Sequence, residues 1–388
     1  MGGMRLAWVV SVATVGAATV WVIPACSGDN DPSGSAGSAG IGGDASVATG
    51  GSAGVDAAGG TGGSADAAQY PSCASGEVSC NEGCLAQPGD EYQGCSLVHM
   101  AESPVSSLAI DDDALYFATN NHGVQKLEFA SSTVSVVADG VSLPKNLVLG
   151  PTDIYYGTYA SDGTVERVSK TGGAPAQLGL GIEWISDLQL AGDTLYVLEA
   201  GTLDSRLRTV SVSSGSTTPF ATGVQSFLID GSTIYYVAEG TSIFGTLTAA
   251  PLASPTQTTQ IATSVFANRL ASDSAALYWI TSTDHSGGVT DHVYYHAAKS
   301  GGTTDRLQEG DLQWEIVHQD GATVYVREQY VFVQPGDADE QVRLLRMPIA
   351  APSRDVFATV EHTSIQAVVT NGSTVYVAAG RAILKLQK

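Results

Sequence analysis

Basic residues are scarce in this sequence. Charged residues make up only 14% of the 388 residues, with 17 Lys and Arg against 39 Asp and Glu, so the formal net charge is −22. No Lys or Arg lies between Arg5 and Lys126. A nucleic-acid backbone is bound by clustered Lys and Arg, and this charge balance therefore argues against a nucleic-acid partner.

Helical periodicity is also missing. No stretch repeats its apolar residues at the 3.6-residue spacing of an amphipathic helix. Apolar residues nevertheless make up 43% of the chain, which is enough for a sizeable core. The sequence therefore indicates an ordered protein built from strands.

The one long hydrophobic run lies at the N-terminus. Arg5 precedes an apolar or small stretch over residues 6–25, which predicts a signal peptide over residues 1–25, with an uncleaved membrane anchor as the alternative. The run ends at Ile23-Pro24-Ala25-Cys26, which resembles the bacterial lipobox, although Pro24 departs from the usual small residue. The resemblance implies lipidation at Cys26. We therefore expect an exported protein that is lipid-anchored in the bacterial cell envelope, in the outer membrane.

Residues 26–69 contain almost nothing that can form a core. Between Ser27 and Gln69, Gly, Ala and Ser occupy 30 of 43 positions, and no residue is aromatic. Such a composition is typical of a flexible tether. We expect this segment to be disordered and to hold a folded domain away from the membrane.

Four cysteines fall within residues 70–95, at Cys73, Cys80, Cys84 and Cys95. In an exported protein they predict two disulfides, with three connectivities open. Zinc is the less favoured alternative, because the cysteines do not form a CxxC pair. The segment from Cys73 to Cys84 resembles a short Cys-rich repeat of secreted myxobacterial proteins. We expect a small segment that depends on its disulfides.

A repeated aliphatic–Tyr pair dominates residues 96–388. The seven tyrosines are separated by 39, 41, 39, 43, 47 and 51 residues, at Tyr116, Tyr155, Tyr196, Tyr235, Tyr278, Tyr325 and Tyr376. Hairpin-turn dipeptides such as Asp230-Gly231 and Asn371-Gly372 separate apolar runs within the units. Four short strands per unit predict a propeller blade, so we expect an all-β, seven-bladed β-propeller of four-stranded antiparallel blades.

The last unit is one strand short. It ends at Leu386-Gln387-Lys388 after three predicted strands, whereas residues 95–102 have the pattern of a fourth strand and precede the first blade. We expect this segment to complete the last blade and to close the ring, with the disulfide at Cys95 holding it. Closure removes open sheet edges, and we expect a monomer.

The fifth unit carries a sequence that resembles the repeat of a known propeller family. Leu277-Tyr278-Trp279-Ile280-Thr281 is similar to the repeat of YWTD propellers, and the blades also resemble NHL-like repeats. The resemblance implies the propeller fold. It does not imply an activity, since propellers include both binding proteins and enzymes.

Polar residues near the start of each innermost strand predict a site at the mouth of the central channel. The candidates are Asn146, Asp187, Asn268, Arg269 and Glu315. Propeller lactonases bind a divalent ion through Glu, Asn and Asp, and by this resemblance Asn146, Asp187, Asn268 and Glu315 could hold Ca²⁺, the one cofactor considered. Lys145 and Arg269 in the same ring oppose a cation.

Two long connections provide a second set of candidates. The connections between the second and third strands lengthen in the fifth unit, over residues 282–291, and in the sixth, over residues 327–341. Long loops on a rigid scaffold often carry function. The candidates there are Asp284, His285, Asp291, His292, Tyr330 and Phe332.

These observations favour a non-catalytic module that binds a protein or a glycan on the channel-mouth face. The alternative is a metal-dependent, lactonase-like hydrolase or lyase with its site at the central channel. No catalytic residue is assigned.

Overall fold

The computed structural model describes residues 73–200, 205–239, 244–284, 290–310, 312–329, 341–361 and 363–388. Cys26 and the predicted signal peptide and tether lie outside these residues. Among the residues described, no helix is long and apolar enough to cross a membrane.

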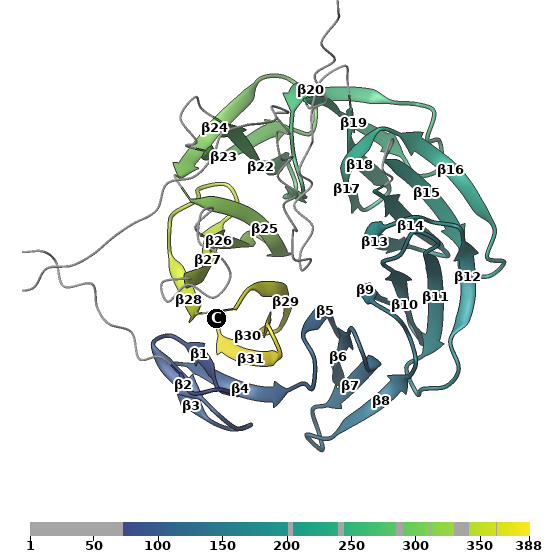
Figure 1. Ribbon diagram of the computed structural model, residues 1–388. Helices are drawn as coiled ribbons and strands as arrows, with labels where there is room; N and C mark the ends of the chain where they lie inside the picture. The colour runs from purple at the N-terminus through teal and green to yellow at the C-terminus, as the bar shows by residue number, and fades with distance from the viewer. Residues whose placement is uncertain are drawn as a thin grey trace, which may run out of the picture. The chain divides into compact units, whose positions relative to one another are not determined.

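Seven antiparallel sheets follow one another around a ring (Figure 1), which confirms the predicted seven-bladed propeller. Blades 1 to 3 are β5 (Val105–Ile110) to β8 (Val134–Ala138), β9 (Pro144–Leu149) to β12 (Ala176–Leu180), and β13 (Ile185–Ala191) to β16 (Thr217–Thr222). Within them lie β6 (Ala114–Thr119), β7 (Gly123–Glu128), β10 (Asp153–Thr158), β11 (Thr164–Ser169), β14 (Thr194–Glu199) and β15 (Arg206–Ser211).

Blades 4 to 6 repeat this order from the innermost strand outward. They are β17 (Val224–Asp230) to β20 (Thr259–Val265), β21 (Leu270–Ser272) to β24 (Thr304–Gly310), and β25 (Gln313–Asp320) to β28 (Val356–Glu361). Within them lie β18 (Thr233–Glu239), β19 (Gly245–Pro251), β22 (Ala276–Asp284), β23 (Thr290–Ala298), β26 (Thr323–Gln329) and β27 (Gln341–Pro348).

Blade 7 joins the two ends of the ring. Its strands β29 (Ile365–Asn371), β30 (Thr374–Ala379) and β31 (Ala382–Gln387) are completed by β4 (Cys95–Met100), with β3 (Glu91–Tyr92) at the edge. Leu97 of β4 pairs with Leu384 of β31, and Arg381 donates from Nε to the carbonyl of Ala101 at 2.8 Å. The predicted closing strand is thus confirmed, and it protects the edge of β31 from pairing with another chain.

The core lies between neighbouring blades, which explains the repeated tyrosine. Tyr116 on the second strand of blade 1 packs with Leu147 and Ile154 of blade 2, and Tyr278 of blade 5 packs with Val324 of blade 6. The seven tyrosines of the repeat are all buried. Each blade therefore needs the aromatic ring to fill the wedge beside the next blade.

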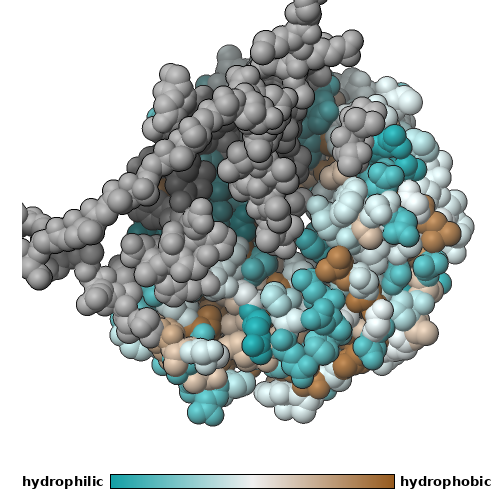
Figure 2. Space-filling view, in the orientation of Figure 1, coloured by the Kyte–Doolittle hydropathy of each residue, from teal (hydrophilic) through white to brown (hydrophobic). Residues whose placement is uncertain are grey.

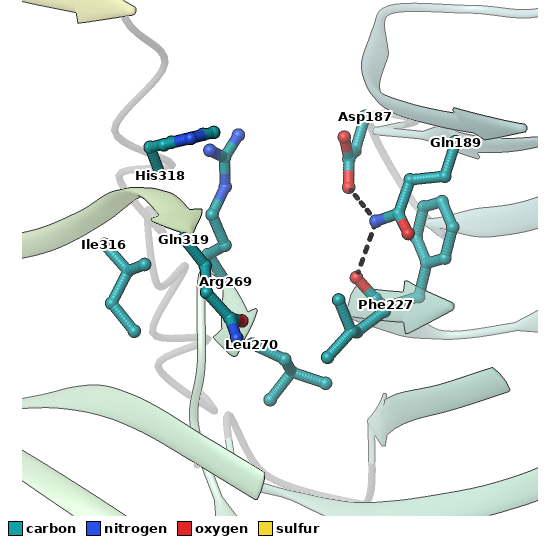
Figure 3. Close-up of a pocket in the computed structure, with 9 residues that line it drawn as sticks. Asp187, Gln189, Phe227, Arg269, Leu270, Ile316, His318 and Gln319 are labelled. Carbon is teal, nitrogen blue, oxygen red and sulfur yellow. Dashed lines mark hydrogen bonds between the residues drawn. The ribbon is translucent and has the colours of Figure 1, made fainter. Parts of the chain in front are cut away.

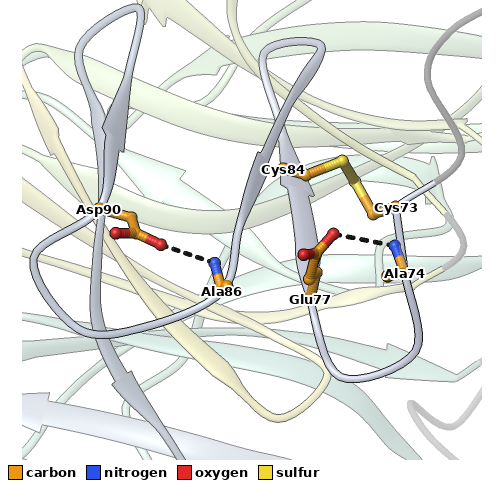
Figure 4. Close-up of a disulfide and its surroundings, with 6 residues drawn as sticks. All are labelled: Cys73, Ala74, Glu77, Cys84, Ala86 and Asp90. Atoms are coloured by element: carbon orange, nitrogen blue, oxygen red, sulfur yellow. Dashed lines mark hydrogen bonds between the residues drawn. A yellow bond between two sulfur atoms is a disulfide. The ribbon is translucent and has the colours of Figure 1, made fainter.

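The cysteines form two overlapping disulfides, Cys73–Cys84 and Cys80–Cys95, which selects one of the three possible connectivities. Figure 4 shows the first, beside the short hydrogen-bonded turns that begin at Ala74 and Ala86. Cys80 ends β1 (Val78–Cys80), which pairs with β2 (Gly83–Leu85). The second disulfide therefore ties the closing strand to this hairpin.

The cysteine hairpin is also held against blade 6. The Asn81 N–H donates to the Thr359 carbonyl at 2.9 Å, and the Thr359 N–H donates to Asn81 Oδ1 at 3.1 Å. Val78, Cys80 and Cys95 belong to one buried cluster with strands of blades 6 and 7. The hairpin therefore covers the junction where the ring closes.

Three ion pairs connect neighbouring blades on the face that carries the tight turns. Lys170 of blade 2 pairs with Asp111 of blade 1 at 2.9 Å. Equivalent pairs join Lys299 of blade 5 to Asp230 of blade 4, and Lys388 of blade 7 to Asp320 of blade 6. In each pair, the Asp lies at or beside the end of an innermost strand and the Lys lies just after a third strand. Ion pairs between blades therefore stabilise this face in addition to the packing of the blades.

Candidate functional site at the channel mouth

The opposite face, called the mouth face below, is where the innermost strands begin and the second strands end. The innermost strands of blades 3 to 6 enclose part of the central channel as a cavity of about 200 Å³. Figure 3 shows Asp187 and Gln189 on one side of it, and Arg269 and His318 on the other. Phe227, Leu228, Leu270 and Ile316 add apolar surface. Two of the predicted residues, Asp187 and Arg269, therefore share one cavity.

The side of blade 3 carries a carboxylate. Asp187 accepts from the Leu188 N–H at 2.9 Å and from Gln189 Nε2 at 3.1 Å. Gln189 also donates to the Phe227 carbonyl at 3.1 Å and accepts from the Ile229 N–H at 2.9 Å, which links blade 3 to blade 4. Gln189 is thus fully used by the fold. The Asp187 carboxylate keeps acceptor capacity, because it has about four lone-pair sites.

The side of blades 5 and 6 carries a guanidinium beside a neutral imidazole. Arg269 Nη1 donates to the Val317 carbonyl at 2.7 Å. Burial lowers the pKa of His318 to about 4, opposed by Asp320 and assisted by Arg269 and Lys388. His318 Nε2 lies 3.1 Å from the hydroxyl of Thr370 on blade 7. At neutral pH, Arg269 is therefore the charged group on this side.

Two of the predicted mouth residues, Asn146 and Glu315, already have partners within the propeller. Asn146 donates from Nδ2 to the Ile185 carbonyl of blade 3 at 3.4 Å. Glu315 pairs with Arg327, and Arg327 also donates to the Ile365 carbonyl of blade 7 at 2.9 Å. Asn268 is exposed just before β21. Asn146 and Arg327 therefore each donate a hydrogen bond to a backbone carbonyl of the next blade.

The predicted calcium ligands do not fit a calcium ion as a set. Glu315 already neutralises Arg327, and Arg269 places a positive charge in the same cavity as Asp187. Among the described residues, the only group of three His, Cys, Asp or Glu ligand atoms is at Cys73, Glu77 and Cys84, where both sulfurs form a disulfide. We assign no reaction step to this ring.

The long loop predicted over residues 282–291 of blade 5 is partly wrong, because strands β22 and β23 extend into it. Strands β22 and β23 extend so far that Asp284 pairs with Thr290, Asp291 with Thr283, and His292 with Ser282. His292 is therefore a buried strand residue, 2% exposed, and not a loop residue. The hairpin is longer than predicted because Thr, Val and Tyr favour strand. His285, Tyr330 and Phe332 lie outside the described residues.

Three side chains around Lys145 on the mouth face, two aromatic and one aliphatic, were not predicted from the sequence. Leu143, Lys145, Tyr159 and Trp184 form what is called the mouth platform below. The Tyr159 ring packs edge-on against Trp184 at 5.0 Å between centroids, and Lys145 Nζ lies 4.4 Å from the Tyr159 ring centroid. The Tyr159 N–H donates to the Leu143 carbonyl at 3.2 Å. Burial lowers the pKa of Lys145.

Two platform residues have an unusual backbone. Leu143 and Trp184 both have φ of +48°, and both stand twelve residues before the repeated tyrosine. Blade 4 has Gly223 at this position, with φ of +63°. A left-handed conformation costs a side-chain-bearing residue about 1–2 kcal/mol. Blades 2 and 3 therefore keep large apolar groups where glycine suits the backbone better.

The surroundings of the platform are acidic. A groove of about 680 Å³ beside it is lined by Asp139, Asp162 and Glu166, together with Ser142, Thr158 and Ala160 next to the platform residues. Elsewhere, the visible surface in Figure 2 is mainly hydrophilic or neutral, with hydrophobic residues scattered among the others. A second aromatic pair, Phe244 and Phe266, lies at the corresponding connections of blades 4 and 5 with ring centroids 6.5 Å apart.

Comparison with solved structures gives the same fold. The N-terminal domain of Nup159 superposes with a TM-score of 0.52 at 11% identity, covering 82% of this chain and 98% of that one. YCF48 bound to D1 peptide gives 0.50 at 9% identity, covering 78% and 97%. This chain shares their propeller fold. Tricorn protease gives 0.51 at 11% identity, but only 33% of that chain is covered. No protein-family model matches the chain, and no curated protein does.

Proposed function

We propose that the propeller is a non-catalytic binding module that takes a protein partner on the mouth platform. The observation that carries this proposal is the left-handed backbone of Leu143 and Trp184, with φ of +48° at both. Strained bulky residues that a glycine could replace are retained where the side chain itself has a use. Partly buried Tyr and Trp rings such as Tyr159 and Trp184 are typical of the centre of a protein interface.

The charge of the surroundings favours a partner with basic residues. The groove next to the platform presents Asp139, Asp162 and Glu166, and the whole chain carries a formal charge of −22. Such a field accelerates the approach of a cationic surface and repels an anionic one. The D1 peptide seen on YCF48, a protein of the same fold, adds support for a polypeptide ligand. A glycan is the alternative ligand, since aromatic rings also stack on sugars.

Photo-crosslinking tests the proposal. A benzophenone amino acid replaces Ser142, which is exposed beside the platform, and in a matched variant it replaces Ser214, which is exposed in a turn of the opposite face. In cells that express the full chain, we expect a discrete crosslinked protein only from position 142, and its loss when Trp184→Ala is added. Equal crosslinking from both positions, or crosslinking unaffected by Trp184→Ala, would contradict the proposal. Binding to a glycan array that depends on Trp184 would instead favour the glycan.

We further propose that the chain is an exported bacterial lipoprotein, anchored in the outer membrane through Cys26. The support is the apolar run over residues 6–25, the lipobox-like Ile23-Pro24-Ala25-Cys26 and the Gly/Ala/Ser-rich segment that follows. The two disulfides agree with an oxidising compartment. Residues 26–69 then act as a tether between the membrane and the propeller.

A further inference from the structure

The central channel has walls of opposite charge. The Asp187 carboxylate lines one side of the 200 Å³ cavity and the Arg269 guanidinium lines the other. His318 beside Arg269 is neutral at pH 7, so it does not add a second positive charge. The apolar side chains of Phe227, Leu228, Leu270 and Ile316 also line this cavity.

Arg269 differs from most cations of this protein. Ten other Lys and Arg residues of the described chain form ion pairs with carboxylates. No carboxylate of the residues described pairs with Arg269, although the protein has 39 acidic residues. Its bond to the Val317 carbonyl uses one nitrogen and fixes the side chain, and a guanidinium has five N–H donors. The remaining donors suit the planar oxygens of a carboxylate.

The net charge of the protein limits what can occupy this place. A free anion approaches against a charge of −22, whereas a ligand without net charge does not. A ligand that carries a cation as well as a carboxylate also satisfies Asp187. The cavity of about 200 Å³ suits a small molecule.

We propose that the channel binds a small zwitterion of the amino-acid class, with its carboxylate on Arg269 and its ammonium group on Asp187. This site is separate from the mouth platform and does not depend on the proposed protein partner. The ligand's own dipole is matched by the two walls, while the apolar residues between them accept a short aliphatic part.

Calorimetric titration of the purified full chain tests this proposal, with L-alanine, L-serine and γ-aminobutyrate as zwitterions and with acetate and ethylamine as half-ligands. We expect at least one zwitterion to bind more tightly than either half-ligand. Arg269→Met and Asp187→Asn should each weaken that binding about tenfold or more, as expected for the loss of a charge-assisted contact. Arg381→Met is the matched control, because Arg381 also donates to a backbone carbonyl but lies outside the cavity.

The outcomes separate clearly. Absence of binding by all three zwitterions, or binding that survives both Arg269→Met and Asp187→Asn, would overturn the proposal. Arg269→Met also removes the bond to Val317, so Asp187→Asn decides if the first variant does not fold. Equal affinity for acetate and the zwitterions would show a simple anion site and reject the role given to Asp187. None of these results bears on crosslinking at Ser142.

Discussion

Removing the Cys80–Cys95 disulfide should destabilise the propeller more than removing Cys73–Cys84. The two bridges span similar lengths of chain, with sequence separations of 15 and 11. Loop-closure entropy alone gives about 3 kcal/mol for each. The Cys80–Cys95 bridge is called the inner pair below and Cys73–Cys84 the outer pair. The inner pair has a second effect, because Cys80 and Cys95 are both 0% exposed, whereas Cys84 is exposed. Truncation of the buried sulfurs should add about 1–2 kcal/mol.

The assay is urea unfolding of the oxidised protein and of two double variants, Cys80→Ala/Cys95→Ala and Cys73→Ala/Cys84→Ala, with free energies obtained by linear extrapolation. We expect losses of about 4–5 kcal/mol for the inner pair and about 3 kcal/mol or less for the outer pair. Amide hydrogens of β31 should exchange faster only in the inner variant, because β31 pairs with β4. An outer pair that costs as much as the inner pair would refute the reasoning.

Three further predictions concern charge and modification. Asp230→Asn should lower the free energy of unfolding by about 0.5–1 kcal/mol, and a double-mutant cycle with Lys299→Met should show that the two effects are coupled. The hydrogen bond from Lys299 lowers the pKa of Asp230. The stabilisation is therefore present above the normal Asp pKa and is lost as the pH falls through the lowered pKa. Burial lowers the pKa of His318 to about 4, so on acidification the unfolded chain binds the proton before the folded one. The stability of the wild-type protein should therefore fall as the pH drops from about 6.5 to about 4. In a pH series of thermal melts, His318→Gln should show a smaller fall over this range. Cys26→Ser should abolish incorporation of a labelled fatty acid, and unchanged labelling would rule out that anchor.

The fold could be predicted because its determinants repeat. Each blade needs a tyrosine to fill the wedge beside its neighbour, and each tight turn needs residues such as Asp230-Gly231, so the period is visible in one sequence. The closing strand at Cys95 was predictable for a related reason: the last unit had three strands and needed a fourth. These requirements are local or periodic.

The site was less predictable because a polar residue on an innermost strand can face water or a neighbouring carbonyl. Asn146 bonds to a carbonyl of the adjacent blade and Glu315 pairs with Arg327 of its own blade, and the sequence shows neither contact. Asp187 and Arg269 could be named because both are polar residues nine positions before the repeated tyrosine, near the start of an innermost strand. Leu143 and Trp184 were missed, although both stand twelve residues before the tyrosine; only the backbone reveals that a glycine would fit there.

The measurement that tests the central claim most directly is a paired determination of stability and partner capture for Leu143→Gly. Leu143 is 36% exposed and has φ of +48°, so glycine should relieve backbone strain. We expect the free energy of unfolding to stay constant or to rise by about 1 kcal/mol, while crosslinking from Ser142 falls. A loss of stability with unchanged crosslinking would mean that Leu143 serves the fold, and it would contradict the mouth platform as the binding surface.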